Sequence, residues 1–195
     1  TPRDHARALR CVVALLASLL PAACAVLPSQ PPASGISRGS HYVAMGSSFG
    51  AGPGVTTVAP GTPARCARSV DNYAQQLARQ RGLALVDVTC SAATTAHVLG
   101  HWDELPPQLD ALRTHTRLVT VTIGGNDLGY IGGLLSASCK ALSLEASLAG
   151  RPCGRAQLPD AAAYEQVASA LRAIAAQVRA RAPVARLVFV DYATV

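Results

Sequence analysis

Four short apolar runs lie along the chain, each followed by small or polar residues. The runs are Tyr42–Met45, Leu83–Val88, Leu118–Ile123 and Leu187–Val190. They consist mainly of aliphatic and β-branched side chains bounded by Gly, Pro or polar residues, which is typical of β-strands. Because their apolar residues are largely continuous and do not alternate with polar ones, the pattern predicts a parallel sheet buried on both faces.

Two segments between these runs have helical periodicity. The first is Asn72–Arg81 and the second is Ala161–Arg181. In the second, apolar residues spaced three and four apart form one stripe: Tyr164, Val167, Leu171, Ile174 and Val178. Asp160 is placed to cap this helix, and Pro183 is placed to end it. The alternation of strands and helices predicts an α/β sandwich.

One long stretch, Leu128–Pro159, has no clear periodicity. It contains Gly132-Gly133 and two cysteines. We therefore expect an irregular excursion over the ends of the strands.

The first 40 residues have the composition of an export signal followed by a linker. Cys11–Leu20 is a ten-residue apolar run behind several arginines, too short to span a bilayer. Ala23-x-Ala25 resembles a signal-peptidase site. We expect residues 1–25 to be a signal peptide, with lipidation at Cys24 or a retained membrane anchor as alternatives. Residues 26–40 are rich in Pro, Ser and Gly and are expected to be a linker to a single domain, residues 41–195.

Composition and charge exclude several classes of protein. Half of the 195 residues are hydrophobic and 14% are charged, whereas a disordered chain is poor in apolar residues and rich in charge. The formal net charge is +6, but the arginines are scattered and form no long run. We therefore expect no nucleic-acid partner.

Candidate chemistry follows the first three apolar runs. The segments are Gly46–Gly54, Cys90–Thr95 and Gly124–Asp127. In a parallel sheet the carboxyl ends of the strands meet at one edge, where ligands bind. This edge would gather serines, an Asn and accessible backbone N–H groups. Acyl transfer needs a hydroxyl nucleophile and hydrogen-bond donors aimed at the oxyanion, so the pattern indicates that chemistry.

Other glycine-rich patterns fit the first segment less well. A dinucleotide-binding fingerprint fails because Val55 stands where the third Gly is required after Gly50 and Gly52. A phosphate-binding loop fails because the segment contains no Lys. Gly46-x-Ser48-x-Gly50 does match the nucleophile elbow of α/β-hydrolases, which remains an alternative.

Together, the three segments resemble the first three conserved blocks of the SGNH/GDSL hydrolases. The matching residues are Gly46-Ser47-Ser48, Cys90-Ser91-Ala92-Ala93-Thr94-Thr95 and Gly124-Gly125-Asn126-Asp127. Arg68-Ser69 and Asn72-Tyr73 resemble a stretch of the secreted bacterial branch. The resemblance runs from about Tyr42 to the end of the chain. It implies a flavodoxin-like three-layer α/β/α sandwich with a parallel sheet, esterase or lipase activity, and no cofactor or metal.

The resemblance also implies roles for individual residues. Ser48 matches the nucleophile, and the oxyanion donors would be the Ser48 N–H, the Ala92 N–H and the Asn126 side chain. Ser47 stands where the family motif has Asp, and Ala92 stands where it usually has Gly. A positive φ at Ala92 would cost about 1 kcal/mol or more. We expect Asp127 to order its loop by hydrogen bonding.

A catalytic base is not apparent. The family's base is a His in an Asp-x-x-His motif near the C-terminus, and residues 1–195 contain no such motif. We expect the last strand, the last helix and this His to lie beyond Val195. His97, His101 and His115 are alternative bases, although they lie between the second and third blocks. A catalytically incomplete member that retains only a binding cleft is the alternative function.

Six cysteines divide according to the predicted export signal. Four remain beyond it, and an even number in an exported protein favours disulfides. Of the three possible pairings we expect Cys66–Cys90 with Cys139–Cys153, the nearest neighbours in sequence. A zinc site lacks any C-x-x-C pair. Trp102 either lines an acyl pocket or packs against a loop.

These features together predict an exported bacterial serine ester hydrolase. We expect it to be secreted or held in the periplasm or cell envelope, to be a monomer, and to act on a small-molecule or lipid ester. Membrane attachment is expected only if Cys24 is lipidated.

Overall fold

The structure is a computed structural model that describes residues 35–141 and 158–192. The predicted signal peptide, Cys24, most of the predicted linker and Cys153 lie outside the described residues. They remain predictions.

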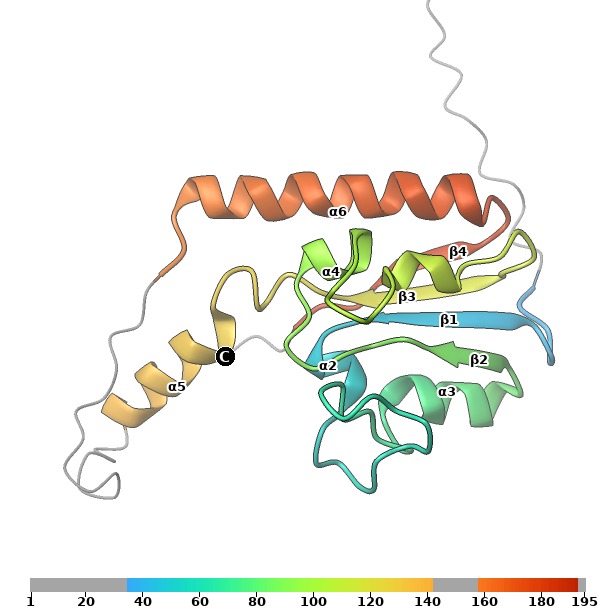
Figure 1. Ribbon diagram of the computed structural model, residues 1–195, viewed down its shortest axis with the longest axis horizontal. Coiled ribbons are helices and arrows are strands. Elements are labelled where there is room, and N and C mark those ends of the chain that lie inside the picture. Colours follow the sequence, from blue (N-terminus) through green and yellow to red (C-terminus); the bar gives the residue numbers. More distant parts are fainter. Residues whose placement is uncertain (1–34, 142–157, 193–195) are drawn as a thin grey trace, which may run out of the picture. The chain divides into compact units, whose positions relative to one another are not determined.

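The described residues form a four-stranded parallel sheet (Figure 1). Its strands are β1 (His41–Gly46), β2 (Ala84–Asp87), β3 (Leu118–Thr122) and β4 (Arg186–Phe189). They lie in the order β2-β1-β3-β4. This is the order of a flavodoxin-like doubly wound sheet, so the predicted fold class is confirmed. All four predicted strands form, with no boundary shifted by more than one residue.

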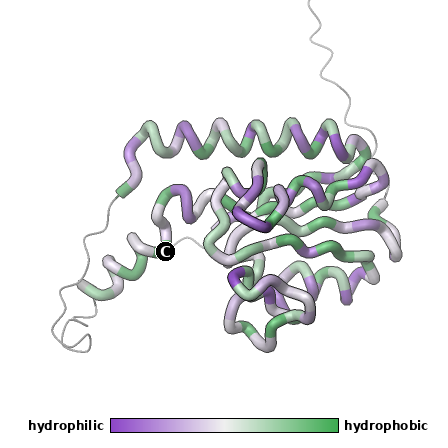
Figure 2. The backbone as a smooth tube through the Cα atoms, viewed as in Figure 1, coloured by the Kyte–Doolittle hydropathy of each residue, from purple (hydrophilic) through white to green (hydrophobic). Residues whose placement is uncertain are grey.

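Helices cover both faces of the sheet. The short helix α2 (Ser48–Ala51) and helix α3 (Tyr73–Arg81) lie on one side in Figure 1. Helix α4 (Thr95–Leu99), the 3-10 helix η1 (Gln108–Ala111) and helix α6 (Ala161–Arg181) lie on the other. Figure 2 shows hydrophobic residues gathered in the strands and hydrophilic stretches interspersed along α6. The three predicted layers are therefore present.

The central strand β1 joins two hydrophobic cores. Its alternate residues Val43 and Met45 pack in the cluster under α6, while Tyr42 and Ala44 pack in the cluster against α3. All four are fully buried. Because both faces of β1 and β3 are covered, their apolar runs are continuous, as the sequence pattern predicts.

The outer strands differ from this expectation. Strand β2 exposes Ala84 and Val86, and β4 exposes Arg186 and Phe189. Among the described strands each of the two pairs on one side only, so it lies where the covering layers end. The prediction of burial on both faces is therefore correct for the two central strands and wrong for the outer two.

Both predicted helices begin at side-chain caps. The Gln75 N–H donates to Asn72 Oδ1 at 2.9 Å, so Asn72 is the cap of α3 rather than its first residue. The Ala163 N–H donates to Asp160 Oδ1 at 2.8 Å, which confirms the predicted cap of α6. The predicted stripe of α6 is buried at Val167, Ile174 and Val178, whereas Tyr164 is 55% exposed near the start of the helix.

The expected irregular stretch begins with a helix, α5 (Tyr130–Ala141). Ile131, Leu134 and Leu135 have helical spacing, and this local periodicity outweighs the cost of Gly132-Gly133, about 1 kcal/mol for each glycine. The expectation is therefore wrong for residues 130–141, while residues 142–157 lie outside the described ones.

A disulfide links the loop before α3 to the end of the β2 segment. Cys66 and Cys90 are bonded with an S–S distance of 2.10 Å, which confirms that predicted pairing. Cys139 is also disulfide-bonded. Its predicted partner Cys153 lies outside the described residues, so this second pairing stays a prediction.

We expect Gly46→Ala to be strongly destabilising. Gly46 has a φ of +142°, and a Cβ on it would lie 2.3 Å from the Thr122 carbonyl oxygen. The free energy of unfolding, measured in urea, should fall by about 3 kcal/mol or more. Gly132→Ala is the matched control: a Cβ there meets nothing within 4 Å, and the helix should gain up to about 1 kcal/mol. Equal effects of the two variants would contradict the packing described.

Removal of the Cys66–Cys90 bond should also lower stability. The bond joins residues 24 apart, and cross-links closing loops of this size are worth about 3 kcal/mol. Cys66→Ala/Cys90→Ala avoids placing new polar groups at two buried positions. Urea unfolding measures the loss, and non-reducing peptide mapping of the parent protein should recover the linked pair. An unchanged unfolding free energy would count against this role of the bond.

Candidate active site

The three segments that follow β1, β2 and β3 meet at one edge of the sheet and are joined by direct hydrogen bonds. The Ser47 N–H donates to the Thr122 carbonyl at 2.9 Å, which ties the first segment to the end of β3. Asn126 Nδ2 donates to the Ala93 carbonyl at 2.8 Å, which ties the third segment to the second. The predicted convergence at the carboxyl ends of the strands is therefore seen.

The two adjacent serines have different surroundings. Ser47 is 1% exposed, and its hydroxyl is 2.8 Å from the Tyr192 hydroxyl. Ser48 is partly exposed and is the first residue of α2. Of the two hydroxyls, the one on Ser48 is therefore accessible to a substrate.

Ala92 has a positive φ, which is costly for a residue that carries a Cβ. Its φ is +66°, a left-handed conformation that favours glycine. The residue is exposed and lies in a turn in which the Ala93 N–H donates to the Cys90 carbonyl at 3.0 Å. The backbone thus keeps a glycine-like geometry here although the residue carries a Cβ.

Asn126 and Asp127 have separate tasks. One amide hydrogen of Asn126 is used by the Ala93 carbonyl, which leaves the second available to a ligand. The Asp127 carboxylate accepts from the Thr95 N–H with both oxygens, at 3.1 Å each. Asp127 therefore holds the start of α4 and orders its loop, as expected.

Gln108 holds the strand end that carries the serines, and the sequence patterns did not single it out. Its Oε1 accepts from the Gly46 N–H at 2.7 Å, and its Nε2 donates to the Gly46 carbonyl at 3.0 Å. The Gln108 side chain is thus a bidentate clamp on the residue before Ser47. A Gln 62 positions away in sequence gives no local signal of such a contact.

Tyr192 is a second site residue that sequence reasoning missed. It follows β4, and its ring lies 4.5 Å from the ring of Phe49 and 5.3 Å from that of Tyr130. Its hydroxyl contacts the Ser47 hydroxyl, as described above. Tyr192 therefore links the end of β4 to the serine-bearing turn.

The candidate substitute bases do not contact Ser48. His97 Nδ1 accepts from the Thr94 N–H at 3.0 Å, and its ring stacks on Trp102 at 4.1 Å. His115 packs against His41 at the start of β1, the opposite edge of the sheet. The pKa of His41 is lowered there, mainly by burial and further by electrostatic interaction with His115 and Arg113.

His101 is exposed on the loop after α4. Within residues 35–141 and 158–192, no His, Asp or Glu side chain is hydrogen-bonded to the Ser48 hydroxyl. The described part of the chain therefore places no candidate base against the Ser48 hydroxyl.

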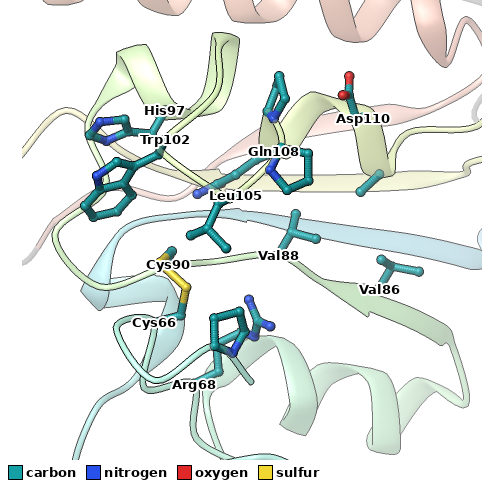
Figure 3. Close-up of a pocket in the computed structure, with 14 residues that line it drawn as sticks. Cys66, Arg68, Val86, Val88, Cys90, His97, Trp102, Leu105, Gln108 and Asp110 are labelled. Carbon is teal, nitrogen blue, oxygen red and sulfur yellow. A yellow bond between two sulfur atoms is a disulfide. The ribbon is translucent and has the colours of Figure 1, made fainter. Parts of the chain in front are cut away.

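A cavity of about 350 Å³ lies between β2 and η1 (Figure 3). Val86 and Val88 line it together with Trp102 and the Cys66–Cys90 bond. The ring of Trp102 stacks on that of His97. The guanidinium carbon of Arg65 lies 5.0 Å from the centroid of the Trp102 ring. Ser48, Ala92 and Asn126 do not line this cavity, so the packing of Trp102 against its loop is the better of its two predicted roles.

Arg68 lines the same cavity and is labelled in Figure 3. Its Nη1 donates to the Thr89 carbonyl at 2.9 Å. Burial lowers the pKa of this guanidinium, and the nearby carboxylate of Asp87 opposes the shift. Arg68 thus holds the disulfide-bearing loop against the end of β2.

A larger cavity, of about 780 Å³, adjoins the loop that carries Asn126. Gly124 and Gly125 form one part of its wall, and α5 and α6 form much of the rest. Its apolar lining includes Leu128, Tyr130, Leu134, Val167, Leu171 and Tyr192. An apolar cavity of this size beside Asn126 has room for the hydrocarbon part of a ligand.

Among the described residues, no group of three or more His, Cys, Asp or Glu side chains is arranged to hold a metal ion. No helix in that part of the chain has the length and hydrophobicity needed to cross a membrane.

Known lipases are similar to the chain in sequence. "Lipase 2" of Streptomyces coelicolor is 40% identical over 154 residues, which cover 77% of this chain and 52% of that protein. A "Lipase" of Streptomyces rimosus is 29% identical over 158 residues, covering 80% and 53%. The chain therefore spans about half the length of these two relatives.

Solved structures of lipases are similar in fold. The extracellular lipase of Streptomyces rimosus superposes with a TM-score of 0.59 at 28% identity, covering 78% of this chain and 60% of that one. Phospholipase A1 of Streptomyces albidoflavus gives 0.57 at 28% identity, with coverage of 79% and 60%. The model of the GDSL-like Lipase/Acylhydrolase family matches residues 44–195. The chain therefore belongs to the GDSL-like lipase/acylhydrolase family, as its three sequence blocks predict.

Proposed function

We propose that the chain carries the nucleophile and the oxyanion hole of an exported serine ester hydrolase. The observation that supports this most directly is the convergence of Ser48, Ala92 and Asn126 at one strand edge, with hydrogen bonds between their loops. An accessible hydroxyl beside fixed donors is the arrangement that acyl transfer requires.

The proposed reaction has two steps. The Ser48 oxygen attacks the ester carbonyl, and the negative charge that forms on the carbonyl oxygen is stabilised by the Ser48 N–H, the Ala92 N–H and Asn126 Nδ2. The alcohol then leaves with a proton, and water hydrolyses the acyl-enzyme to release the acid and regenerate the serine. The proton must pass through a base, for which we propose a histidine of the family's Asp-x-x-His type.

Ala92 is the strained member of this arrangement. A residue with a Cβ at φ +66° costs about 1 kcal/mol, and such strain is typical of sites where the backbone must present a particular group. The proposed reason for the strain is the direction of the Ala92 N–H toward the oxyanion. The Cβ should also narrow the entrance to the site.

The relatives suggest the class of substrate and the compartment. They are named lipases and a phospholipase A1, and the 780 Å³ apolar cavity beside Asn126 could hold an acyl chain. We propose a small-molecule or lipid ester as substrate and no nucleic acid as partner. The relative described as extracellular and the Cys66–Cys90 disulfide support secretion or a place in the bacterial cell envelope, and we expect a monomer.

A second candidate function is binding without catalysis. It is favoured by one observation: no base among the described residues contacts Ser48. Such a protein would use the same edge and cavity to hold an ester or acyl group. Activity of the full reading frame separates the two candidates.

Ser48→Ala should abolish hydrolysis. In the full-length protein we expect kcat/KM for p-nitrophenyl butyrate to fall by about 10⁴-fold or more, because the nucleophile is lost. Ser37→Ala, which changes an exposed serine outside the site, is the matched control and should retain the parent rate. Retention of activity by Ser48→Ala would refute the mechanism, and an inactive parent protein would favour the binding function.

Ala92→Gly should be far better tolerated by the fold than an ordinary Ala-to-Gly change. Glycine adopts φ +66° without strain, which offsets the entropy it adds to the unfolded chain. Ala96→Gly, at an exposed helical position four residues away, should lose about 1 kcal/mol of unfolding free energy. Urea unfolding of both variants should differ by at least about 1 kcal/mol in favour of Ala92→Gly. Equal losses would show that Ala92 is not strained.

A further inference from the structure

We propose that Tyr192 is a positioning residue, whose hydroxyl holds the Ser48 turn against the loop of Asn126 through a hydrogen bond with Ser47. The inference rests on the proposed function, because it concerns the geometry between a nucleophile and its oxyanion donor. Nothing in the sequence motif of the family blocks points to residue 192.

The side chain of Ser47 is hydrogen-bonded to a distant residue and not to its own helix. It is 1% exposed and precedes α2 at the position where serine usually caps a helix, yet it makes no capping bond. Its hydroxyl lies 2.8 Å from the Tyr192 hydroxyl. In place of a local capping bond, the Ser47 hydroxyl therefore contacts a residue 145 positions away in the sequence.

The ring of Tyr192 packs between Phe49 and the loop that carries Asn126. A Cβ added to Gly125 would lie 2.6 Å from ring atoms of Tyr192, so the ring rests directly on the backbone before Asn126. The same ring lies 4.5 Å from that of Phe49, the residue after Ser48. Tyr192 therefore contacts the residues on both sides of the nucleophile and the residue before the oxyanion Asn.

The other hydrogen bonds of the serine turn hold the end of β1 and do not hold the turn against the Asn126 loop. Gln108 and Thr122 bond to the backbone of Gly46 and Ser47 and so hold the end of β1. None of these bonds joins the Phe49 side of the turn to the Asn126 loop. The Tyr192 side chain spans that separation, with its hydroxyl on the serine turn and its ring on Gly125.

A shift of the turn would affect the rate more than substrate binding. Misplacement of a nucleophile by a fraction of an ångström lowers the rate of attack, because the reacting atoms must be aligned. Tyr192→Phe keeps the ring that lines the large cavity and removes only the hydroxyl. The variant should therefore lower kcat and leave KM nearly unchanged.

The test is a double-mutant cycle in the full-length protein with p-nitrophenyl butyrate. We expect Tyr192→Phe, Ser47→Ala and the double variant each to lower kcat by about three- to tenfold, since all three lose the same hydrogen bond, while KM stays within about twofold. If kcat is unchanged in Tyr192→Phe, or if the two single effects multiply in the double variant, the inference is wrong.

Tyr42→Phe is the matched control. The Tyr42 hydroxyl lies 2.8 Å from Thr120 Oγ1, so this variant also loses a tyrosine hydrogen bond, away from Ser48 and Asn126. Its melting temperature should fall as in Tyr192→Phe, but its kcat should remain that of the parent protein. An equal fall of kcat in both variants would reduce the effect of Tyr192 to stability alone.

Amide hydrogen exchange provides a readout that does not depend on activity. The Gly50 and Ala51 N–H groups bond to the Ser47 carbonyl, and the Tyr130 N–H bonds to the Gly125 carbonyl. In Tyr192→Phe these three amides should exchange about three- to tenfold faster, while amides within α3 keep their rates. Unchanged exchange would overturn the inference even in an active protein. Faster exchange in a protein without esterase activity would uphold the positioning contact and refute only the proposed function.

Discussion

The close approach of β1 and β3 at Gly46 is the constraint on which the rest of the site depends. Gly46 pairs with Thr122 in parallel register, and a Cβ on Gly46 would lie 2.3 Å from the Thr122 carbonyl oxygen. The two strands can therefore meet at this point only without a side chain between them. Ser48 lies two residues after Gly46, and Gly124 lies two residues after Thr122, so this contact between the strands brings the two segments together at the edge of the sheet.

Most of the fold could be predicted because its strands and its longest helix follow from local sequence patterns. The strands follow from short apolar runs, and α6 follows from its 3.6-residue stripe and the cap at Asp160. Helix α5 was missed because Gly132-Gly133 obscured a weaker periodicity. The exposure of β2 and β4 was missed because composition alone does not tell a central strand from an outer one.

The candidate site divides in the same way. Ser48, Ala92 and Asn126 belong to short motifs directly after strands, so a parallel topology brings them together without further information. Gln108 and Tyr192 act through contacts 62 and 145 residues away along the chain. Neither lies in a motif, and their roles become visible only when the packing is known. Sequence therefore predicts the groups proposed to react better than the groups that hold them.

Ser47 and Tyr192 are best understood as a pair. The family motif has Asp where Ser47 stands, and a carboxylate at a position 1% exposed would need cationic or multiple donor partners to offset its loss of hydration. A serine hydroxyl is neutral, and one tyrosine hydroxyl at 2.8 Å satisfies it. Ser47 therefore places a neutral hydroxyl, and no charge, at this buried position. Its hydrogen bond with Tyr192 links the serine turn to the segment that follows β4, which a carboxylate satisfied by local donors would not do.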